Sequence, residues 1–385
     1  MRSKPCDLRN VLVAVSGQTP AIITETLWAL ERRFATSVDE IRVITTTQGL
    51  HIIEKRLLGA NGEFSRFCAD YGISPGRIAF SEKNVYVLEG SDGRGLEDIR
   101  TGSDNLNAAD QVFGLISEWC GRKGERLLCS VAGGRKTLGI YLAMSLMMCG
   151  RARDKLYHVL VTPEFETGVP DFFYPPPVER FFDRFCRGEG QAPEKISSAA
   201  AGVELAEIPF LRLREAIGEG IDFQKGYTEA VAQSQLLMNY LHAPPSLTLK
   251  LKTRQVGIGQ FEFTLSRQLA AVYGFFLLQF NGLGAHGSMD SLFEKRELLS
   301  DLERQIDRYG VGEKAFYSWE RMRDADEFRE QIGPCISKVN RALRRGLGSG
   351  FLASRYAIST GRRYGVNVEL FKVFGADGKT WKGLR

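Results

Sequence analysis

Strand-like and helix-like segments alternate over the first 175 residues of this 385-residue chain. Residues 9–16 are apolar and rich in Val, and residues 21–34 carry apolar side chains at helical spacing, with Pro20 in the first turn and Thr19 as N-cap. Further strands are predicted at 40–46, 84–88, 126–132 and 156–162, and further helices at 48–58, 105–122 and 136–149. Alternation at this spacing predicts an α/β fold, with a mostly parallel sheet between two layers of helices.

The composition changes between residues 163 and 205, where three consecutive prolines precede a stretch rich in Gly, Ala and Ser. This change predicts a first domain at 1–180, a linker at 181–205 and a mainly helical, basic domain at 206–385. Beyond the linker strand signals are few, and helical patterns occupy residues 227–241, 265–281, 288–309 and 326–347. A short β-pair is predicted from residues 354–358 and 365–373. Helices followed by a hairpin favour a winged helix-turn-helix, although other α+β modules share this pattern.

Several classes of protein are excluded by composition and spacing. The longest apolar stretches, 141–149 and 270–280, are shorter than the roughly 20 residues of a membrane span, and no apolar signal core begins the chain. Seven scattered cysteines without a CxxC pair and four histidines without ligand spacing favour neither a disulfide framework nor a metal site. We therefore expect a cytoplasmic protein with no membrane contact, no metal and no cofactor.

Positive charge is concentrated near the C-terminus. Residues 338–385 contain eleven Lys or Arg and two acids, a net +9 against +5 for the whole chain, which leaves −4 for residues 1–337. Such a segment is typical of polyanion contact, and also of a solvated basic surface or a dimer contact. The candidate DNA-binding residues are Lys338, Arg341, Arg344 and Arg345 on one helix, and Arg362 and Arg363 in the turn of the predicted β-pair.

Two turns carry the residues best suited to bind an anion. Residues 16–20 (SGQTP) follow the first strand and residues 132–137 (AGGRKT) follow a later one, and both lead into helices. In open α/β sheets ligands bind at the carboxyl ends of strands, where helix N-termini offer free N–H groups. The second turn is no P-loop, because Arg135 stands where that motif requires Gly, and it lacks the Rossmann fingerprint. A tight βα turn with Arg135 and Lys136 solvated is the alternative.

Several segments, in this order, resemble one known family. Residues 13–20 (VAVSGQTP) run into 24–30 (TETLWAL), and the loop 97–101 (EDIRT) precedes Asp104 and Asn105. Residues 130–137 (SVAGGRKT), 158–161 (HVLV) and 173–175 (FYP) follow. Over residues 10–180 the chain resembles the CRISPR-associated ring nucleases of the CARF-domain superfamily, and it departs from their pattern at Gln18 and Thr19.

The resemblance implies a Rossmann-like CARF domain in a homodimer, with one pocket across the two-fold axis for a cyclic oligoadenylate, most often cyclic tetra-adenylate. It implies metal-independent cleavage by the ribose 2′-OH to linear di-adenylate with a 2′,3′-cyclic phosphate, which switches off type III CRISPR signalling. The open alternative is a DNA-binding transcriptional regulator that responds to cyclic oligoadenylate with little or no cleavage. No Arg precedes His242 or His286 with four to six residues between the two, so a HEPN ribonuclease is not expected.

The chemistry suggests a role for each residue of the turns. The expected catalytic residues are Lys136 as stabiliser of the phosphorane charge, Arg135 as a phosphate clamp and Ser16 as an orienting hydroxyl. Ser16 and Thr101 have an alternative role as helix caps, and Asp98 as a partner of Arg100. The aromatic residues 172–174 are expected in the core or in a dimer contact, and a platform on which a base stacks is the alternative. The expected ligand-binding residues are Gly17, Gln18, Thr19, Asp98, Arg100, Thr101, Asn105, Gly133, Gly134 and Thr137.

Overall fold

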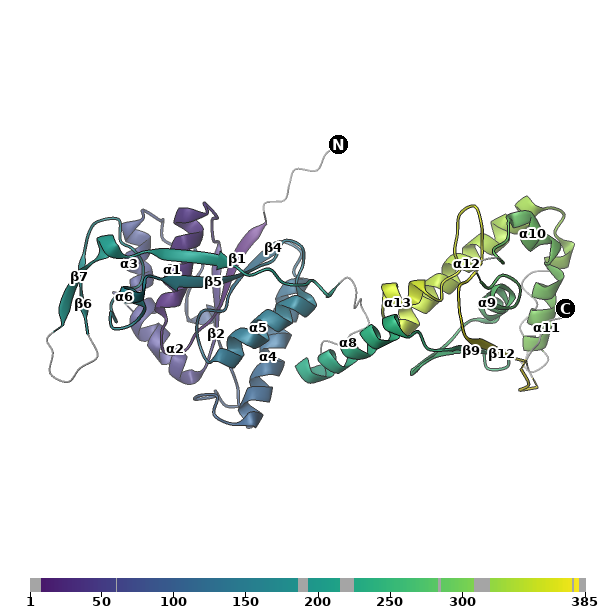
Figure 1. Cartoon of the computed structure of the whole chain (residues 1–385), viewed down its shortest axis with the longest axis horizontal. Helices are drawn as coiled ribbons and strands as arrows, with labels where there is room; N and C mark the ends of the chain where they lie inside the picture. Colours follow the sequence, from purple (N-terminus) through teal and green to yellow (C-terminus); the bar gives the residue numbers. More distant parts are fainter. Residues whose placement is uncertain are drawn as a thin grey trace. The chain divides into compact units, whose positions relative to one another are not determined.

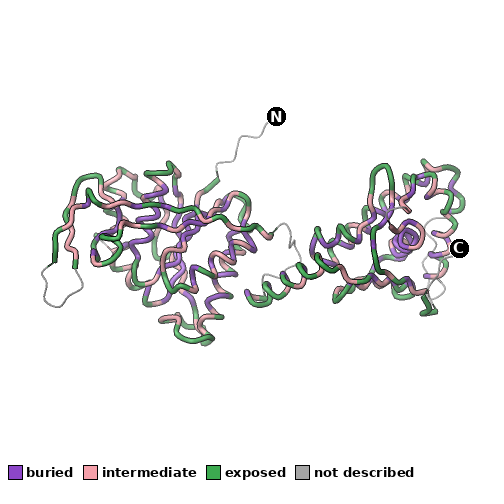
Figure 2. Tube along the Cα trace, in the orientation of Figure 1, coloured by how far each residue is buried: buried purple, intermediate pink, exposed green. Residues whose placement is uncertain are grey.

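The computed structural model describes residues 8–59, 61–185, 193–214, 225–282, 285–307, 319–375 and 377–380. It divides into two compact units (Figure 1), and each contains buried apolar residues (Figure 2). The first unit comprises Met1–Arg214 and Phe223–Ala230, and the second comprises Glu215–Asp222 and Val231–Arg385. No helix in the described part of the chain combines the length and apolar character that crossing a membrane requires.

A six-stranded sheet forms the centre of the first unit. Its strands, in spatial order, are β3 (Val85–Val87), β2 (Glu40–Thr45), β1 (Arg9–Val15), β4 (Glu125–Ser130), β5 (Lys155–Val161) and β8 (Val203–Glu207). All neighbours pair in parallel except β5 and β8, which are antiparallel. The predicted α/β fold with a mostly parallel sheet is therefore confirmed.

Helices cover both faces of this sheet because the side chains of β1 point alternately to opposite faces and are buried on each. Leu12 and Ala14 belong to a core that includes residues of α1, while Val11 and Val13, which are also buried, point to the other face. The helical segments are α1 (Ala21–Trp28) with η1 (Ala29–Arg33), α2 (Thr47–Ile53) with η2 (Glu54–Leu58), α3 (Glu63–Asp70), η3 (Glu82–Asn84), α4 (Gly102–Gly121), α5 (Lys136–Cys149) and α6 (Pro163–Glu166). The predicted helices at 21–34, 48–58, 105–122 and 136–149 are confirmed, whereas α3 was not predicted.

The segment predicted to be a linker contains strands instead. β6 (Phe181–Arg184) pairs antiparallel with β7 (Glu194–Ser197), the short η4 (Ser198–Ala200) follows, and β8 completes the main sheet. In β8 only Val203 and Leu205 are buried. This alternation of buried and exposed residues is too short to predict a strand in a region rich in Gly and Ala. The open edge of β5 supplies the hydrogen bonds that make this segment a strand.

The second unit combines helices with a four-stranded sheet. Its helical segments are α8 (Tyr227–His242), α9 (Arg267–Gln279), α10 (Met289–Glu294), α11 (Glu297–Asp307), η7 (Trp319–Arg321), α12 (Ala325–Leu347) and α13 (Gly350–Ser354). Its strands are β9 (Leu247–Lys250), β10 (Gln255–Ile258), β11 (Phe261–Thr264) and β12 (Phe371–Phe374), in the order β11-β10-β9-β12. The predicted helices at 227–241, 265–281 and 326–347 are confirmed, and the one at 288–309 is divided into α10 and α11, with residues 308 and 309 outside the described residues. The meander β9–β11 was missed because its strands are only four residues long.

The predicted β-pair around residues 361–363 is wrong. Residues 350–354 form α13, a single antiparallel bridge joins Ser359 to Gly365, and β12 pairs in parallel with β9. All four residues of β12 pair with β9, so they form a ladder with a distant strand and not with the local segment that the prediction gave them. The hairpin that supported the winged helix-turn-helix interpretation is therefore not present among the described residues.

Candidate functional site

The strand order brings together the two turns that the sequence predicts to bind an anion. Within the sheet β1 lies between β2, the next strand along the chain, and β4. The strand order therefore reverses at β1, and the end of β1 is a topological switch point. Ala14 pairs with Ser130, which aligns the carboxyl ends of β1 and β4. A Cβ atom at Gly17 would lie 3.1 Å from the Cα atom of Gly134, so the backbones of the two turns are in contact.

A polar cavity of about 320 Å³ lies between these turns. Most of the turn residues that the sequence predicts as site residues line this cavity, together with residues from the end of β2 and the start of α2. The lining residues are Ser16, Gly17, Gln18, Thr19, Thr46, Gln48, Gly49, Asp98, Ala132, Gly133, Gly134, Arg135 and Leu138.

Only glycine fits the second turn. A Cβ at Gly133 would lie 2.6 Å from the carbonyl oxygen of Val15, a contact that real Cβ atoms do not make. Gly134 has φ of +75°, in the left-handed region that side chains with a Cβ avoid. The two glycines therefore let the backbone approach β1 closely and then turn into α5.

The Ser16 hydroxyl is buried at the cavity without a hydrogen-bond partner among the described residues. Its backbone is held firmly, because the Ser16 N–H donates to the Ile44 carbonyl at 3.1 Å and the Thr45 hydroxyl donates to the Ser16 carbonyl at 2.8 Å. Ser16 caps no helix, since Pro20 is at the N-cap of α1, and Thr19 does not cap it either. A buried unpaired hydroxyl costs about 1–3 kcal/mol, which marks this side chain as a place where a ligand would supply the missing partner.

Asp98 holds Arg135 at the cavity. Arg135 occupies the N-cap of α5, and its Nε donates to Asp98 Oδ1 at 2.9 Å while a second guanidinium N–H donates to Oδ2. These hydrogen bonds, with a longer one from Arg100 Nε at 3.4 Å, lower the pKa of Asp98 to about 2. Because a guanidinium has five N–H donors, Arg135 keeps donors for an anion while the carboxylate fixes its direction.

Several predicted site residues lie outside the lining of this cavity. Lys136 and Thr137 form the first turn of α5, and Lys136 is exposed beside Arg135. Arg100 is exposed and contacts Asp98.

Two further predicted ligand residues have structural roles in α4. The Thr101 hydroxyl accepts from the Asp104 N–H at 3.1 Å, and the Asp104 carboxylate accepts from the Thr101 N–H at 2.9 Å, so the alternative role of Thr101 as a helix cap is the observed one. Asn105 donates to the Tyr141 hydroxyl at 2.5 Å, which joins α4 to α5.

Three residues that were not predicted, Thr46, Gln48 and Gly49, line the cavity from the end of β2. Thr46 is the N-cap of α2, where its hydroxyl accepts from the Gly49 N–H. The signal was available, since β2 also ends at this edge of a parallel sheet. Nothing in the local sequence, however, says that β2 is the neighbour of β1.

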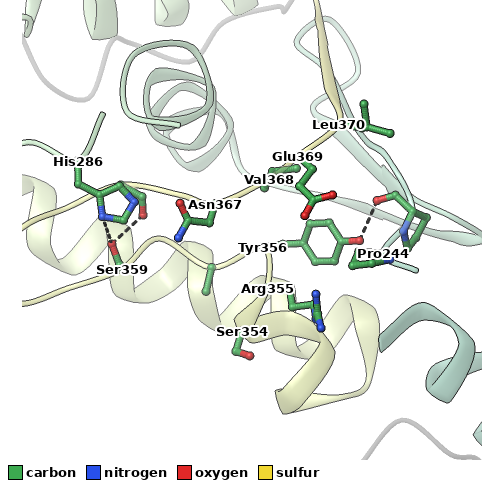
Figure 3. A pocket seen from close by; sticks show the side chains of 13 residues that line it. Pro244, His286, Ser354, Arg355, Tyr356, Ser359, Asn367, Val368, Glu369 and Leu370 are labelled. Carbon is green, nitrogen blue, oxygen red and sulfur yellow. Dashed lines mark hydrogen bonds between the residues drawn. The ribbon is translucent and has the colours of Figure 1, made fainter. Parts of the chain in front are cut away.

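The second unit contains a cavity of about 410 Å³, lined among others by His286, Arg355, Tyr356, Ser359 and Glu369 (Figure 3). Ser359 Oγ lies 3.4 Å from His286 Nδ1, but the Ser359 hydroxyl donates to the Gly365 carbonyl at 2.9 Å. The serine proton is therefore engaged by a backbone oxygen, and the pair holds the loop 359–365 closed rather than forming an activated nucleophile.

The basic residues of α12 share a solvated face. Phe328, Ile332, Val339 and Leu343 lie among the buried residues of α12, and the cations project from the other side. The exposed cations are Lys338, Arg341, Arg344 and Arg345 on α12, and Arg362 and Arg363 in the following loop.

In the described part of the chain, no cluster of three His, Cys, Asp or Glu residues is arranged to hold a metal ion.

Comparisons with known proteins complete the description of the site. The model of the family described as CRISPR-associated protein NE0113 (Cas_NE0113) matches residues 19–237. No curated protein matches the chain. Among solved structures the chain is similar to Enterococcus italicus Csm6 bound to cyclic hexa-2′-fluoro-hexa-dAMP, with 10% sequence identity, a TM-score of 0.31 and coverage of 89% of this chain and 81% of that chain.

Proposed function

The chain belongs to the CRISPR-associated protein NE0113 family, and from this premise we propose that it is a metal-independent ring nuclease for cyclic oligoadenylate, with cyclic tetra-adenylate as the expected ring. The observation that carries the proposal is the contact between the turns at Gly17 and Gly134. The polar cavity between these turns is lined by Arg135 at the N-terminus of α5 and by Ser16, whose hydroxyl has no partner among the described residues. These are groups that bind phosphate oxygens.

The proposed reaction is cleavage by the ring's own ribose. The 2′-oxygen attacks the adjacent phosphorus, the bond from phosphorus to the 5′-oxygen breaks, and the proton lost by the 2′-hydroxyl is balanced by one gained by the 5′-oxygen. The products are a 2′,3′-cyclic phosphate and a 5′-hydroxyl, without metal or external nucleophile. The protein must align these atoms and stabilise the added negative charge of the phosphorane.

Each group at the cavity has a part in this proposal. Arg135 donates to the non-bridging oxygens from a position fixed by Asp98, and the first turn of α5 adds backbone N–H groups. Ser16 orients the phosphate or the 2′-hydroxyl through its Oγ, which has no hydrogen-bond partner in the part of the chain that the structure describes. Lys136, exposed at the start of α5, supplies the second positive charge through its long flexible side chain.

Slow turnover follows from the lining of the cavity. Among the described residues that line it, none is histidine, so no group with a pKa near neutrality stands ready as general base. Single-turnover kinetics on the purified protein check this expectation. A rate that rivals histidine-based ribonucleases would contradict it.

The cavity is small for a whole ring. Its volume of about 320 Å³ is at the lower end of the range of about 300–1,000 Å³ for ligand pockets. We propose that a second copy of the chain supplies the other half of the site in a homodimer. Analytical ultracentrifugation with and without cyclic tetra-adenylate tests this, and a species that stays monomeric when saturated with ring would refute it.

One experiment separates enzyme from sensor. The purified protein is incubated with labelled cyclic tetra-adenylate in EDTA, and the products are separated by chromatography. Linear di-adenylate with a cyclic phosphate end supports the nuclease. An intact ring that is tightly bound supports the regulator, and an intact unbound ring contradicts both.

The exposed cationic face of α12 favours a second candidate function, a ligand-responsive DNA-binding regulator. Each phosphate that the Lys and Arg side chains neutralise would steepen the salt dependence of binding. A gel-shift series with duplex DNA at rising salt tests it. Absence of a shift at the lowest salt would dismiss this function.

A further inference from the structure

A second cavity adjoins the first, and Gln18 and Thr19 line both. It has a volume of about 470 Å³ and lies among α1, α2 with η2, and the segment that contains α6. Its remaining lining residues are Pro20, Ala21, Glu25, Ile52, Arg56, Phe165, Glu166, Gly168, Val169, Pro170, Phe172, Phe173 and Phe185. A group bound here would lie next to whatever occupies the polar cavity.

The walls of this second cavity are aromatic. Phe165, Phe172 and Phe173 are buried, and the rings of Phe165 and Phe172 pack 4.7 Å apart between centroids. The guanidinium of Arg56 stacks over Phe173 at 5.0 Å and donates to Asp171 Oδ1 at 2.8 Å, so its charge is already engaged. These walls suit a flat apolar ring.

One polar side chain within this apolar surround is unexplained by the fold. Glu25 on α1 is 6% exposed, and among the described residues no hydrogen bond or charged neighbour contributes to the shift in the pKa of its carboxyl group. Burial raises the pKa of Glu25 to about 8, without a contribution from a neighbouring charge. The charged groups that line the same cavity are Arg56 and the exposed Glu166. At neutral pH Glu25 is therefore a neutral acid, with one O–H donor and one carbonyl acceptor facing an aromatic cavity.

This pair of hydrogen-bonding groups discriminates between purine bases that present the edge carrying N7. Adenine presents an acceptor at N7 beside a donor at N6, whereas guanine presents two acceptors, N7 and O6. A protonated carboxyl group complements the adenine edge, because it donates once and accepts once. On the same edge of guanine its carbonyl oxygen would face N7 or O6, and two acceptors repel each other.

We propose that the second cavity binds the adenine base of a nucleotide whose phosphate occupies the polar cavity, with Glu25 as the residue that selects adenine. The inference rests on the proposed function for the identity of the nucleotide. Gln18 and Thr19, which border both cavities, would lie beside the ribose that joins base to phosphate. The aromatic residues then have a second use beyond core packing, as the apolar wall of the base site.

The test measures the dissociation constant for cyclic tetra-adenylate at pH 6.5 and pH 9 in wild type, Glu25→Gln and Glu25→Met. Gln keeps one donor and one acceptor at every pH, and Met keeps the length of the side chain without either. We expect wild type to bind about ten-fold more weakly at pH 9, Glu25→Gln to bind equally at both values, and Glu25→Met to lose about ten-fold at both. Cyclic tetra-guanylate, as matched ligand, should bind wild type at least ten-fold more weakly at pH 6.5.

Two results separate failure of this inference from failure of the proposed function. If wild type binds cyclic tetra-adenylate and neither pH nor Glu25→Met changes its affinity, the base site is refuted while the ring nuclease stands. If wild type does not bind the ring, the proposed function fails, and adenosine monophosphate is then titrated by NMR. Binding of the monophosphate that Glu25→Met weakens supports the base site, and absence of such binding overturns it. Thermal unfolding of each variant verifies that the fold is retained.

Discussion

Replacing Gly133 by Ala tests whether the close approach of the two turns makes the site. The added Cβ would lie 2.6 Å from the Val15 carbonyl and 3.0 Å from Ile22 Cγ1, whereas ordinary contact begins at 3.4 Å. Val15 is fixed by ladders to β2 and β4 and Ile22 is buried in the core, so the turn itself must move by the better part of an ångström.

The magnitude follows from the cost of forcing an extra carbon into a packed place. Overpacking of this kind costs about 1–3 kcal/mol, and in a unit of 150–250 residues each kcal/mol lowers Tm by about 2–4 °C. We therefore expect Gly133→Ala to lower Tm by roughly 2–12 °C. Displacement of the turn should also weaken binding of cyclic tetra-adenylate at least ten-fold at 20 °C, where the protein remains folded.

Gly114→Ala is the matched control. Gly114 lies within α4 with an ordinary φ, and a Cβ added there would meet no atom within 4 Å, so the same substitution should stabilise the helix by about 0.4–1 kcal/mol. Calorimetry gives Tm, and isothermal titration gives affinity. If Gly133→Ala matched wild type in both measurements, or if the two alanine variants behaved alike, the steric account of the turn would be wrong.

The remaining predictions concern single side chains. Ser16→Ala should leave the free protein as stable as wild type or up to about 1–3 kcal/mol more stable, because it deletes a buried hydroxyl without a partner among the described residues. The same variant should bind the ring more weakly. Lower stability in urea titrations would contradict this prediction, because it would show that the hydroxyl has a structural role. Lys136→Ala should abolish cleavage with Tm unchanged, whereas the exposed Lys123→Ala should cleave normally; wild-type rates in Lys136→Ala would remove Lys136 from the mechanism. Glu25 is protonated in the folded protein up to about pH 8 but ionised above its ordinary value when unfolded, so its contribution lowers stability by about 1.4 kcal/mol per pH unit between pH 5 and 8. Denaturant titrations should show this slope, and Glu25→Gln should remove it; equal slopes in both proteins would contradict the assignment.

Local pattern was sufficient for most of the first unit. The Val-rich strands, the helical spacing after each turn and the position of both glycine-bearing turns depend on residues close in sequence, and they fold as expected. Local pattern did not predict the short strands, because their pairing depends on residues distant in the sequence. β8 and the meander β9–β11 contain four or five residues each, and only a neighbouring strand edge makes them strands.

The sequence alone determined the chemical character of the site: two turns at carboxyl ends of parallel strands, glycines that permit close approach, and Arg135 at a helix start. Tertiary structure decided which side chains face the cavity. It joined Arg135 to Asp98, 37 residues away, and left the Ser16 hydroxyl without a partner among the described residues. It placed Thr101 and Asn105 outside the cavity lining and buried Glu25 at an aromatic cavity. The physical reason is range. Turn geometry and helix periodicity are set by neighbours along the chain, whereas burial, pKa and hydrogen-bond partners depend on which distant segments the sheet brings together.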